Sequence, residues 1–181
     1  MFSIPLGDNA RLRPLEPWQA EEFLDHMDRA RDYVGEHIGF ADRATDLGSA
    51  RELLTGYAQK HAADTGRIHG IRLDGTLVGG VLFRTFDAAA GNCEIGCWLE
   101  PAAEGRGLVT TASRCLIDWA FGERGMHRVE WVASTTNARS LAVAKRLGMT
   151  REGVMRESFP YRGVRQNLEI WSVLATEWQP A

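Results

Sequence analysis

The chain has 181 residues, of which 44% are hydrophobic and 25% are charged, a composition typical of globular proteins and not of disordered, collagenous or coiled-coil ones. Its 21 lysines and arginines and 24 aspartates and glutamates give a net charge of −3, which predicts no broad basic surface for DNA or RNA. It contains neither a secretion signal nor an apolar run of roughly 18 residues, so we expect a cytoplasmic protein with no membrane partner. Its three cysteines lack metal-ligand spacing, so we expect reduced thiols and no metal.

The first third of the chain is expected to contain one strand and two helices. No repeat or low-complexity linker divides the sequence, so we interpret residues 1–181 as a single domain. We expect a short strand at 9–15, a helix at 17–31 and a second helix at 49–63, for which Ser49 can act as the N-cap. The segment between the two helices, 33–46, has glycines and isolated aromatic residues without a period, and is expected to be a loop.

The remaining elements predict a mixed sheet. Three antiparallel strands are expected at 67–73, 76–86 and 93–99, because Asp74-Gly75 between the first two favours a tight hairpin turn with positive φ. Helices and strands then alternate. We expect a helix at 108–123, a strand at 129–133, a helix at 138–147 that ends at Gly148, and strands near 150–158 and 165–174. Together these elements predict an α+β fold.

A glycine-containing turn leads from the strand at 93–99 directly into the helix that begins near residue 108. Gly105 and Gly107 allow the backbone to approach a ligand closely, and Arg106 adds a positive charge between them. The N–H groups from about Gly105 to Val109 can point outward together at the helix N-terminus, a geometry that binds phosphate. A Gly-x-Gly before a helix can also be only a turn. The phosphate motifs of P-loop NTPases and dinucleotide oxidoreductases are absent, which disfavours both classes.

A second segment runs from Asn137 to Thr150. Asn137 is well placed to cap the helix that follows, and Ser140 lies one turn later. Capping by both residues is the structural alternative to a role in chemistry.

The two segments occur in this order about 30 residues apart, and they resemble the GNAT superfamily of N-acetyltransferases. Within it they resemble the RimJ/RimL-type group, which acetylates N-terminal amines of ribosomal proteins or similar small amines. The resemblance extends over nearly the whole chain and is carried by Arg11-Leu-Arg-Pro-Leu, Leu77-Val-Gly-Gly, Glu94-Ile-Gly-Cys-Trp-Leu, Gly105-Arg-Gly and Asn137-x-x-Ser140 through Leu147-Gly148. It implies a largely antiparallel sheet of about seven strands, splayed in the middle and flanked by about four helices.

The resemblance also implies that acetyl-CoA lies in a V-shaped opening between the strand at 93–99 and the strand at 127–133. The expected cofactor-binding residues are Cys97, Trp98, Leu99, Gly105, Arg106, Gly107, Leu108, Val109, Asn137 and Ser140. A bulge at Gly96 would help to place the thioester. Glu104 departs from the family pattern, which has Gln or Arg at this position, and it puts a negative charge beside the expected pyrophosphate.

Acetyl transfer needs a neutral amine, a polarised thioester carbonyl and a proton for the leaving thiolate. Backbone N–H groups near residues 97–99 could polarise the carbonyl. Many family members use a tyrosine as the acid, but this chain has Ala144 at that position. The resemblance to the RimL type implies that Ser140 is the acid instead, and that Asn137 holds the serine or the pantetheine in place.

The general base is not fixed by the sequence. RimL-type enzymes have a base glutamate where this chain aligns Phe159, so we take Glu94 as the first candidate and Glu157 as the second. A solvated strand carboxylate, or one paired with an arginine, is the alternative for Glu94. A free α-amine titrates near pH 8 and lysine near 10.4, so a poor base favours an α-amine or another acceptor with a low pKa.

The acceptor is expected to contact residues of irregular segments, namely Tyr33, His37, Phe40 and Tyr161. We therefore expect direct transfer from acetyl-CoA to a primary amine, a protein N-terminus or a small molecule, in a ternary complex without a metal. The alternatives are a non-catalytic acyl-CoA-binding module and a transferase for a longer acyl group such as succinyl. Homodimerisation is common in the group.

Overall fold

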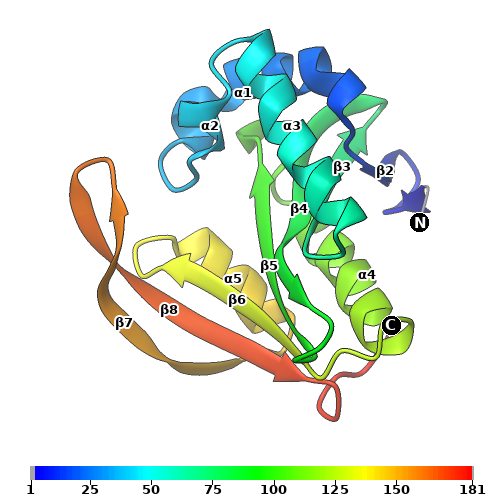
Figure 1. Cartoon of the computed structure of the whole chain (residues 1–181), viewed down its shortest axis with the longest axis vertical. Coiled ribbons are helices and arrows are strands. Elements are labelled where there is room, and N and C mark those ends of the chain that lie inside the picture. The colour runs from blue at the N-terminus through cyan, green and yellow to red at the C-terminus, as the bar shows by residue number, and fades with distance from the viewer. Residues whose placement is uncertain (1–2, 181) are drawn as a thin grey trace.

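The computed structural model describes residues 3–180, in which one eight-stranded sheet has the strand order β1-β2-β3-β4-β5-β6-β8-β7 (Figure 1). The strands are β1 (Ile4–Pro5), β2 (Ala10–Pro14), β3 (Arg67–Leu73), β4 (Thr76–Asp87), β5 (Asn92–Leu99), β6 (Arg128–Ser134), β7 (Thr150–Tyr161) and β8 (Val164–Leu174). The helices are α1 (Ala20–Val34), α2 (Phe40–Arg43), α3 (Leu47–Ala62), α4 (Leu108–Gly122) and α5 (Ala138–Arg146). No helix of the described residues is long and apolar enough to cross a membrane.

The mixed, largely antiparallel α+β fold is confirmed, with one more strand and one more helix than expected. The additional helix, α2, lies inside the segment 33–46, so the prediction of a loop there is wrong in part. The prediction that Ser49 caps the next helix is also wrong. Asp46 is the N-cap of α3, and Ser49 completes a capping box: its N–H donates to Asp46 Oδ1 at 2.8 Å while its Oγ accepts from the Asp46 N–H at 3.0 Å.

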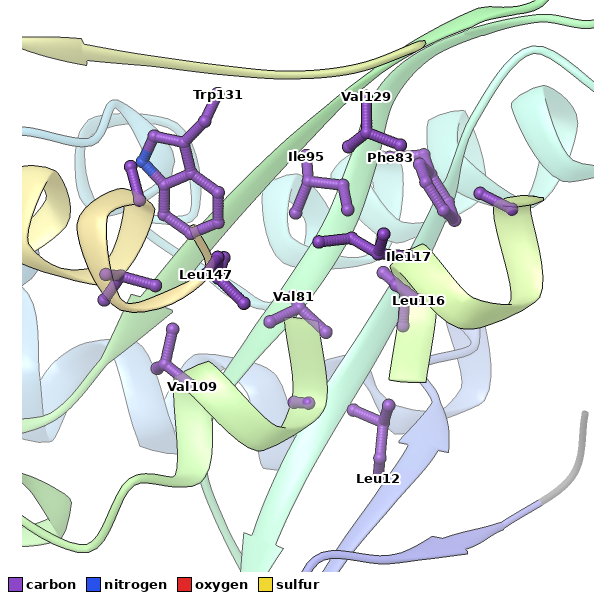
Figure 2. Close-up of a cluster of buried hydrophobic side chains, with 14 of the residues drawn as sticks. Leu12, Val81, Phe83, Ile95, Val109, Leu116, Ile117, Val129, Trp131 and Leu147 are labelled. Atoms are coloured by element: carbon purple, nitrogen blue, oxygen red, sulfur yellow. The ribbon is translucent and has the colours of Figure 1, made fainter. Parts of the chain in front are cut away.

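Helices cover both faces of the sheet. The helices α1, α2 and α3 pack on one face against a cluster that contains Phe23, Leu54 and Trp98. The helices α4 and α5 pack on the other face, and Figure 2 shows Leu116 and Ile117 of α4 in this second cluster. The two cores cover most of the central strands β4 and β5, so the place where β5 loses its neighbour is the main opening in this part of the sheet.

Such an edge is created where β5 and β6 separate. The two strands are parallel and pair only from Asn92↔Arg128 to Ile95↔Trp131. Beyond these residues the strands diverge, as Figure 1 shows, and β6 continues in antiparallel pairing with β8. The expected splay in the middle of the sheet is therefore confirmed, and residues 96–99 of β5 form one wall of the opening.

The expected bulge at Gly96 is wrong, because Gly96 pairs in step with Leu82 and its neighbour Cys97 with Val81. The irregularity lies in the partner strand β4, where Phe83 pairs with Ile95 and Thr85 pairs with Glu94, which leaves Arg84 as an extra residue. This bulge lets Phe83 and Phe86, three residues apart, both face the core, with ring centroids 5.1 Å apart. Regular strand alternation would put them on opposite faces.

The glycine pair Gly79-Gly80 in β4 allows close packing against Trp98 of β5. A Cβ added to Gly80 would overlap with the Trp98 ring and the His69 carbonyl, and one added to Gly79 would overlap with the Trp98 backbone. Only glycine therefore lets Trp98 take its place at the wall of the opening.

Candidate active site

A cavity of about 550 Å³ lies at the opening between β5 and β6. Its walls come from the end of α1 and the segment that follows it, the end of β5, the turn that precedes α4, the first turn of α4, and one side of α5. Nine of the ten expected cofactor-binding residues line it, namely Cys97, Trp98, Leu99, Gly105, Gly107, Leu108, Val109, Asn137 and Ser140. The tenth residue, Arg106, does not line the cavity.

The N-terminus of α4 faces this cavity without a capping side chain. Its N-cap is Gly107 at φ +71°, and the Thr111 N–H makes the first helical hydrogen bond, to the Gly107 carbonyl oxygen at 3.0 Å. The N–H groups of Leu108, Val109 and Thr110 therefore have no partner within the helix. The first turn contains no acidic residue, so the partial positive charge of the helix end is not neutralised there. These features suit an anion such as a diphosphate.

Glu104 lies at the same cavity but its carboxylate is engaged by two other residues. The Tyr33 hydroxyl donates a hydrogen bond to Glu104 Oε1, and Arg139 Nε lies 3.7 Å from the same oxygen. The Arg139 guanidinium also lies over the Tyr33 ring, 4.8 Å from its centre. Burial and the hydrogen bond to Glu104 together raise the pKa of Tyr33 to about 12. The negative charge of Glu104 is thus partly balanced by Arg139, and the trio spans α1, the turn and α5.

Ser140 is held by two hydrogen bonds at the start of α5. Asn137 Oδ1 accepts from the Ser140 N–H at 3.1 Å, which confirms that Asn137 caps the helix. Trp131 Nε1 on β6 donates to Ser140 Oγ at 2.9 Å, and Figure 2 shows its indole extending from β6. Because the indole N–H occupies a lone pair of the oxygen, the hydroxyl hydrogen of Ser140 remains free to donate elsewhere.

Trp131 is a site residue that sequence reasoning missed. It is 1% exposed and belongs to the core, but its indole N–H also binds the hydroxyl of Ser140, the candidate acid. Nothing in the sequence separates it from the other tryptophans, because the contact depends on how β6 and α5 pack.

A second cavity, of about 340 Å³, adjoins the first. It is bordered by α2, α3, β4, the diverging part of β6 and the β7–β8 hairpin. The two cavities share the residues His37, Ile38, Cys97, Trp98, Asn137 and Ser140. Ser140 therefore lies where the cavities meet, so two molecules bound on either side could react beside its hydroxyl.

The four residues expected at the acceptor have different surroundings. Tyr33 lies in the last turn of α1, not in an irregular segment, and lines the first cavity. His37 lines both cavities, and its buried Nδ1 has no hydrogen-bond partner within residues 3–180. Phe40 lines the second cavity but is only 7% exposed in α2. Tyr161 lines neither cavity, because its hydroxyl donates to the Gly35 carbonyl at 2.7 Å.

Neither candidate base lines a cavity. The Glu94 carboxylate on β5 is 16% exposed and lies 3.1 Å from Arg84 Nε. This ion pair corresponds to the alternative stated for Glu94, a strand carboxylate paired with an arginine. Burial raises the pKa of Glu94, while Arg84 acts in the opposite direction. Glu157 is exposed in β7 at φ +50°, and its N–H donates to Asn167 Oδ1 at 2.8 Å. Glu94 has the better environment for a proton acceptor, since a raised carboxyl pKa strengthens a base.

The cysteine at the junction is not set up as a nucleophile. Burial raises the pKa of Cys97 to about 12, so its thiolate is scarce near neutral pH. Cys93, Cys97 and Cys115 are all free thiols. Residues 3–180 contain no group of three or more His, Cys, Asp or Glu side chains that could hold a metal ion.

Trp98 is fixed by a buried histidine that sequence reasoning assigned no function. Trp98 Nε1 donates to His26 Nε2 at 3.0 Å, and His26 Nδ1 lies 3.2 Å from Glu100 Oε2. Because Nε2 accepts, the imidazole is neutral and its Nδ1–H donates to Glu100. Burial and the nearby charge of Arg29 lower the pKa of His26 to about 3. This network holds the tryptophan at the wall that both cavities share.

Comparisons with family models and with known proteins agree on one family. Residues 9–150 match the family described as acetyltransferase (GNAT) domain. A Bacillus subtilis (strain 168) protein named ribosomal N-acetyltransferase YdaF is 31% identical over 180 residues, which cover 99% of this chain and 98% of YdaF.

Two solved structures share the fold at lower identity. RimL, a ribosomal L7/L12 α-N-protein acetyltransferase in complex with coenzyme A, has a TM-score of 0.90 at 17% identity and covers 95% of this chain and 97% of its own. Mycobacterium smegmatis RimJ, in complex with CoA-disulfide, has a TM-score of 0.84 at 21% identity and covers 93% of this chain and 83% of its own.

Proposed function

The chain belongs to the GNAT acetyltransferase family and is an acetyl-CoA-dependent N-acetyltransferase similar to ribosomal-protein acetyltransferases, and we propose that it acetylates a primary amine by direct attack in a ternary complex. The observation that carries this proposal is the junction of two cavities at Ser140. A donor in the first cavity and an acceptor in the second can meet there without an enzyme-bound acetyl group.

The first cavity fits coenzyme A. The free N–H groups at the start of α4 suit a diphosphate, and the diverging edge of β5 offers unpaired backbone groups to the amides of a pantetheine arm. We propose that Gly105 and Gly107 to Val109 hold the diphosphate and that Cys97, Trp98 and Leu99 line the pantetheine. Acetyl-CoA supplies the activated thioester, and the residues around it position that group and exclude water.

We propose that Ser140 supplies the proton for the leaving thiolate. Its hydroxyl hydrogen is free because Trp131 N–H occupies a lone pair of the oxygen, and the bond to Asn137 fixes the backbone from which the side chain projects. Backbone N–H groups along residues 97–99 are the candidates that polarise the thioester carbonyl.

The acceptor amine is proposed to enter through the second cavity, past His37. The relative YdaF is named a ribosomal N-acetyltransferase, and a protein N-terminal α-amine fits the lack of a strong base at the junction. Such an amine is about one-tenth neutral at pH 7, whereas a lysine side chain is almost entirely charged. Glu94 is the proposed base and would act through water, since it does not line the cavity itself.

Release of free thiol from acetyl-CoA with a panel of amines tests this function. We expect turnover with α-amine peptides, and thermal stabilisation by acetyl-CoA with or without an amine. Stabilisation without thiol release from any amine would instead identify an acyl-CoA-binding module. Comparing acetyl-CoA with succinyl-CoA in the same assay tests the longer acyl group.

Two further measurements test the chemistry. Incubation with acetyl-labelled acetyl-CoA and no acceptor should leave the protein unlabelled, and stoichiometric labelling would refute direct transfer. Ser140→Ala keeps the backbone bond to Asn137, so it should lower kcat by about 100-fold or more, as expected for loss of a general acid, with acetyl-CoA affinity nearly unchanged. Equal loss of turnover and affinity would mean that Ser140 only binds.

A further inference from the structure

The second cavity has a positively charged lining. Arg43, Lys60 and Arg84 line it from α2, α3 and β4, and no aspartate or glutamate is among the described residues that do so. The three cations gather around Tyr57. Lys60 Nζ lies 5.3 Å from the centre of that ring. Burial raises the pKa of Tyr57, while the charges of Arg84 and Arg43 both act in the opposite direction.

Among the described residues, only one of the three cations is paired with a carboxylate. Arg84 Nε lies 3.1 Å from Glu94 Oε1. Lys60 Nζ donates to the Arg84 carbonyl oxygen at 2.9 Å and forms no direct ion pair with a carboxylate within residues 3–180. Arg43 forms no ion pair within residues 3–180, because the carboxylate of its neighbour Asp42 pairs with Arg162 at 2.6 Å. Two full positive charges therefore remain at the wall of this cavity.

These charges select among amine acceptors. A polyamine or a lysine-rich segment would bring further positive charge into the cavity and would be repelled. An acceptor that carries a carboxylate or phosphate near its amine would be attracted. The positive surroundings also favour the neutral form of the acceptor amine, which is the nucleophile.

From this lining, and resting on the proposed function, we infer that the acceptor is a primary amine with an anionic group close to it, a carboxylate or a phosphate. Arg43 and Lys60 are the residues that recognise that group. The inference concerns the acceptor alone and is separate from the binding of acetyl-CoA, which uses the other cavity.

Matched peptides test the inference. The four peptides share an N-terminal serine and differ only at positions 2 to 4. The acidic peptide has Asp and Glu there, the neutral peptide Asn and Gln, the third peptide Lys, and the fourth phosphoserine. We expect kcat/KM for the acidic or the phosphorylated peptide to exceed that of the neutral peptide about tenfold at low salt, and the lysine peptide to be slowest. The advantage should shrink as ionic strength rises. The carboxylate and phosphate arms identify which anion is preferred.

The inference would be wrong if kcat/KM for the neutral or the lysine peptide equalled that for both anionic peptides. That result would leave the proposed function intact. Thiol release from none of the peptides would overturn both.

Substitution of Arg43 tests the assignment of the charges. Arg43→Gln should lower the ratio of kcat/KM for the acidic over the neutral peptide about threefold, and Arg43→Glu should lower it about tenfold and improve the lysine peptide. Arg51→Gln is the matched control, because Arg51 is exposed on α3 and does not line the cavity. A ratio that changes equally in Arg43→Gln and Arg51→Gln would refute the role of Arg43.

Discussion

The turn before α4 allows a sharp test of the cofactor site, through Gly107→Ala. Gly107 has a φ of +71° and lines the first cavity, and a Cβ added there meets no protein atom within 4 Å. An alanine held at positive φ costs about 1 to 2 kcal/mol, partly offset by a gain of about 0.4 to 1 kcal/mol from a less flexible unfolded chain. The net loss of about 1 kcal/mol corresponds to a drop in Tm of about 2 to 4 °C for a chain of this size.

Gly125→Ala is the matched control for backbone strain. Gly125 has a φ of +62°, a Cβ added there also meets nothing within 4 Å, and the residue lies outside both cavities. Both variants should lose similar stability without ligand. At an acetyl-CoA concentration about 100 times its Kd, the wild-type protein and Gly125→Ala should gain about 2.7 kcal/mol of stability.

Gly107→Ala should lose at least tenfold in acetyl-CoA affinity, and so about 1.4 kcal/mol of that gain, because its methyl group stands where the diphosphate has to approach the helix N–H groups. Thermal unfolding with and without acetyl-CoA, together with calorimetric Kd values, measures both effects. Equal acetyl-CoA affinity in the two variants would refute the placement of the diphosphate at this turn.

Three further predictions concern side chains. Glu104→Gln removes a negative charge beside the proposed diphosphate and should tighten acetyl-CoA binding up to about fivefold by calorimetry, whereas weaker binding would give Glu104 a positive role in holding the cofactor. Trp131→Phe deletes the N–H that binds Ser140 and should lower kcat about fivefold at unchanged acetyl-CoA affinity; Trp171→Phe, whose indole donates to Glu169, is the control and should leave kcat unchanged. His26 has a pKa of about 3 in the fold against 6.5 when unfolded, so its contribution to stability is complete above pH 6.5 and is lost as pH falls toward 3. In urea unfolding, the wild-type protein should therefore lose on the order of 1 kcal/mol more of its free energy of unfolding between pH 6.5 and 5.5 than His26→Gln loses. Equal losses in the two proteins would show that His26 is protonated in the fold.

Local signals in the sequence were sufficient for most of the framework. The Asp74-Gly75 turn forms the expected β3–β4 hairpin, with both residues at positive φ and Leu73 paired with Thr76. Asn137 caps α5 as expected. These features depend on residues within one or two turns of each other, and their geometry is set by backbone conformations that few residue types adopt. The cytoplasmic location and the homodimer stay predictions.

Features that depend on distant segments were not predictable. The bulge at Arg84 allows Phe83 and Phe86 both to face α4. The sequence of β4 alone does not show that both rings belong to the same core. The engagement of Glu104 by Tyr33 joins residues 71 positions apart, and the bond from Trp98 to His26 joins residues 72 positions apart. Spacing along the chain carries no signal for such pairs.

The bulge at Arg84 also connects the fold to the proposed choice of acceptor. Counted from Phe83, which faces α4, strand alternation places Arg84 on the opposite face, the one that carries α3. On that side of the sheet the Arg84 carbonyl oxygen accepts from Lys60 Nζ, and the Arg84 guanidinium pairs with Glu94. The bulge thus returns Phe86 to the aromatic core on one side of the sheet, while Arg84 stays in the cationic wall on the other side. Because Arg84 is neutralised by Glu94, the free charge available to an acceptor is that of Arg43 and Lys60, and Lys60→Gln should reduce the preference for acidic peptides as Arg43→Gln does. A preference that survives loss of both charges would place the recognition of the acceptor outside this cavity.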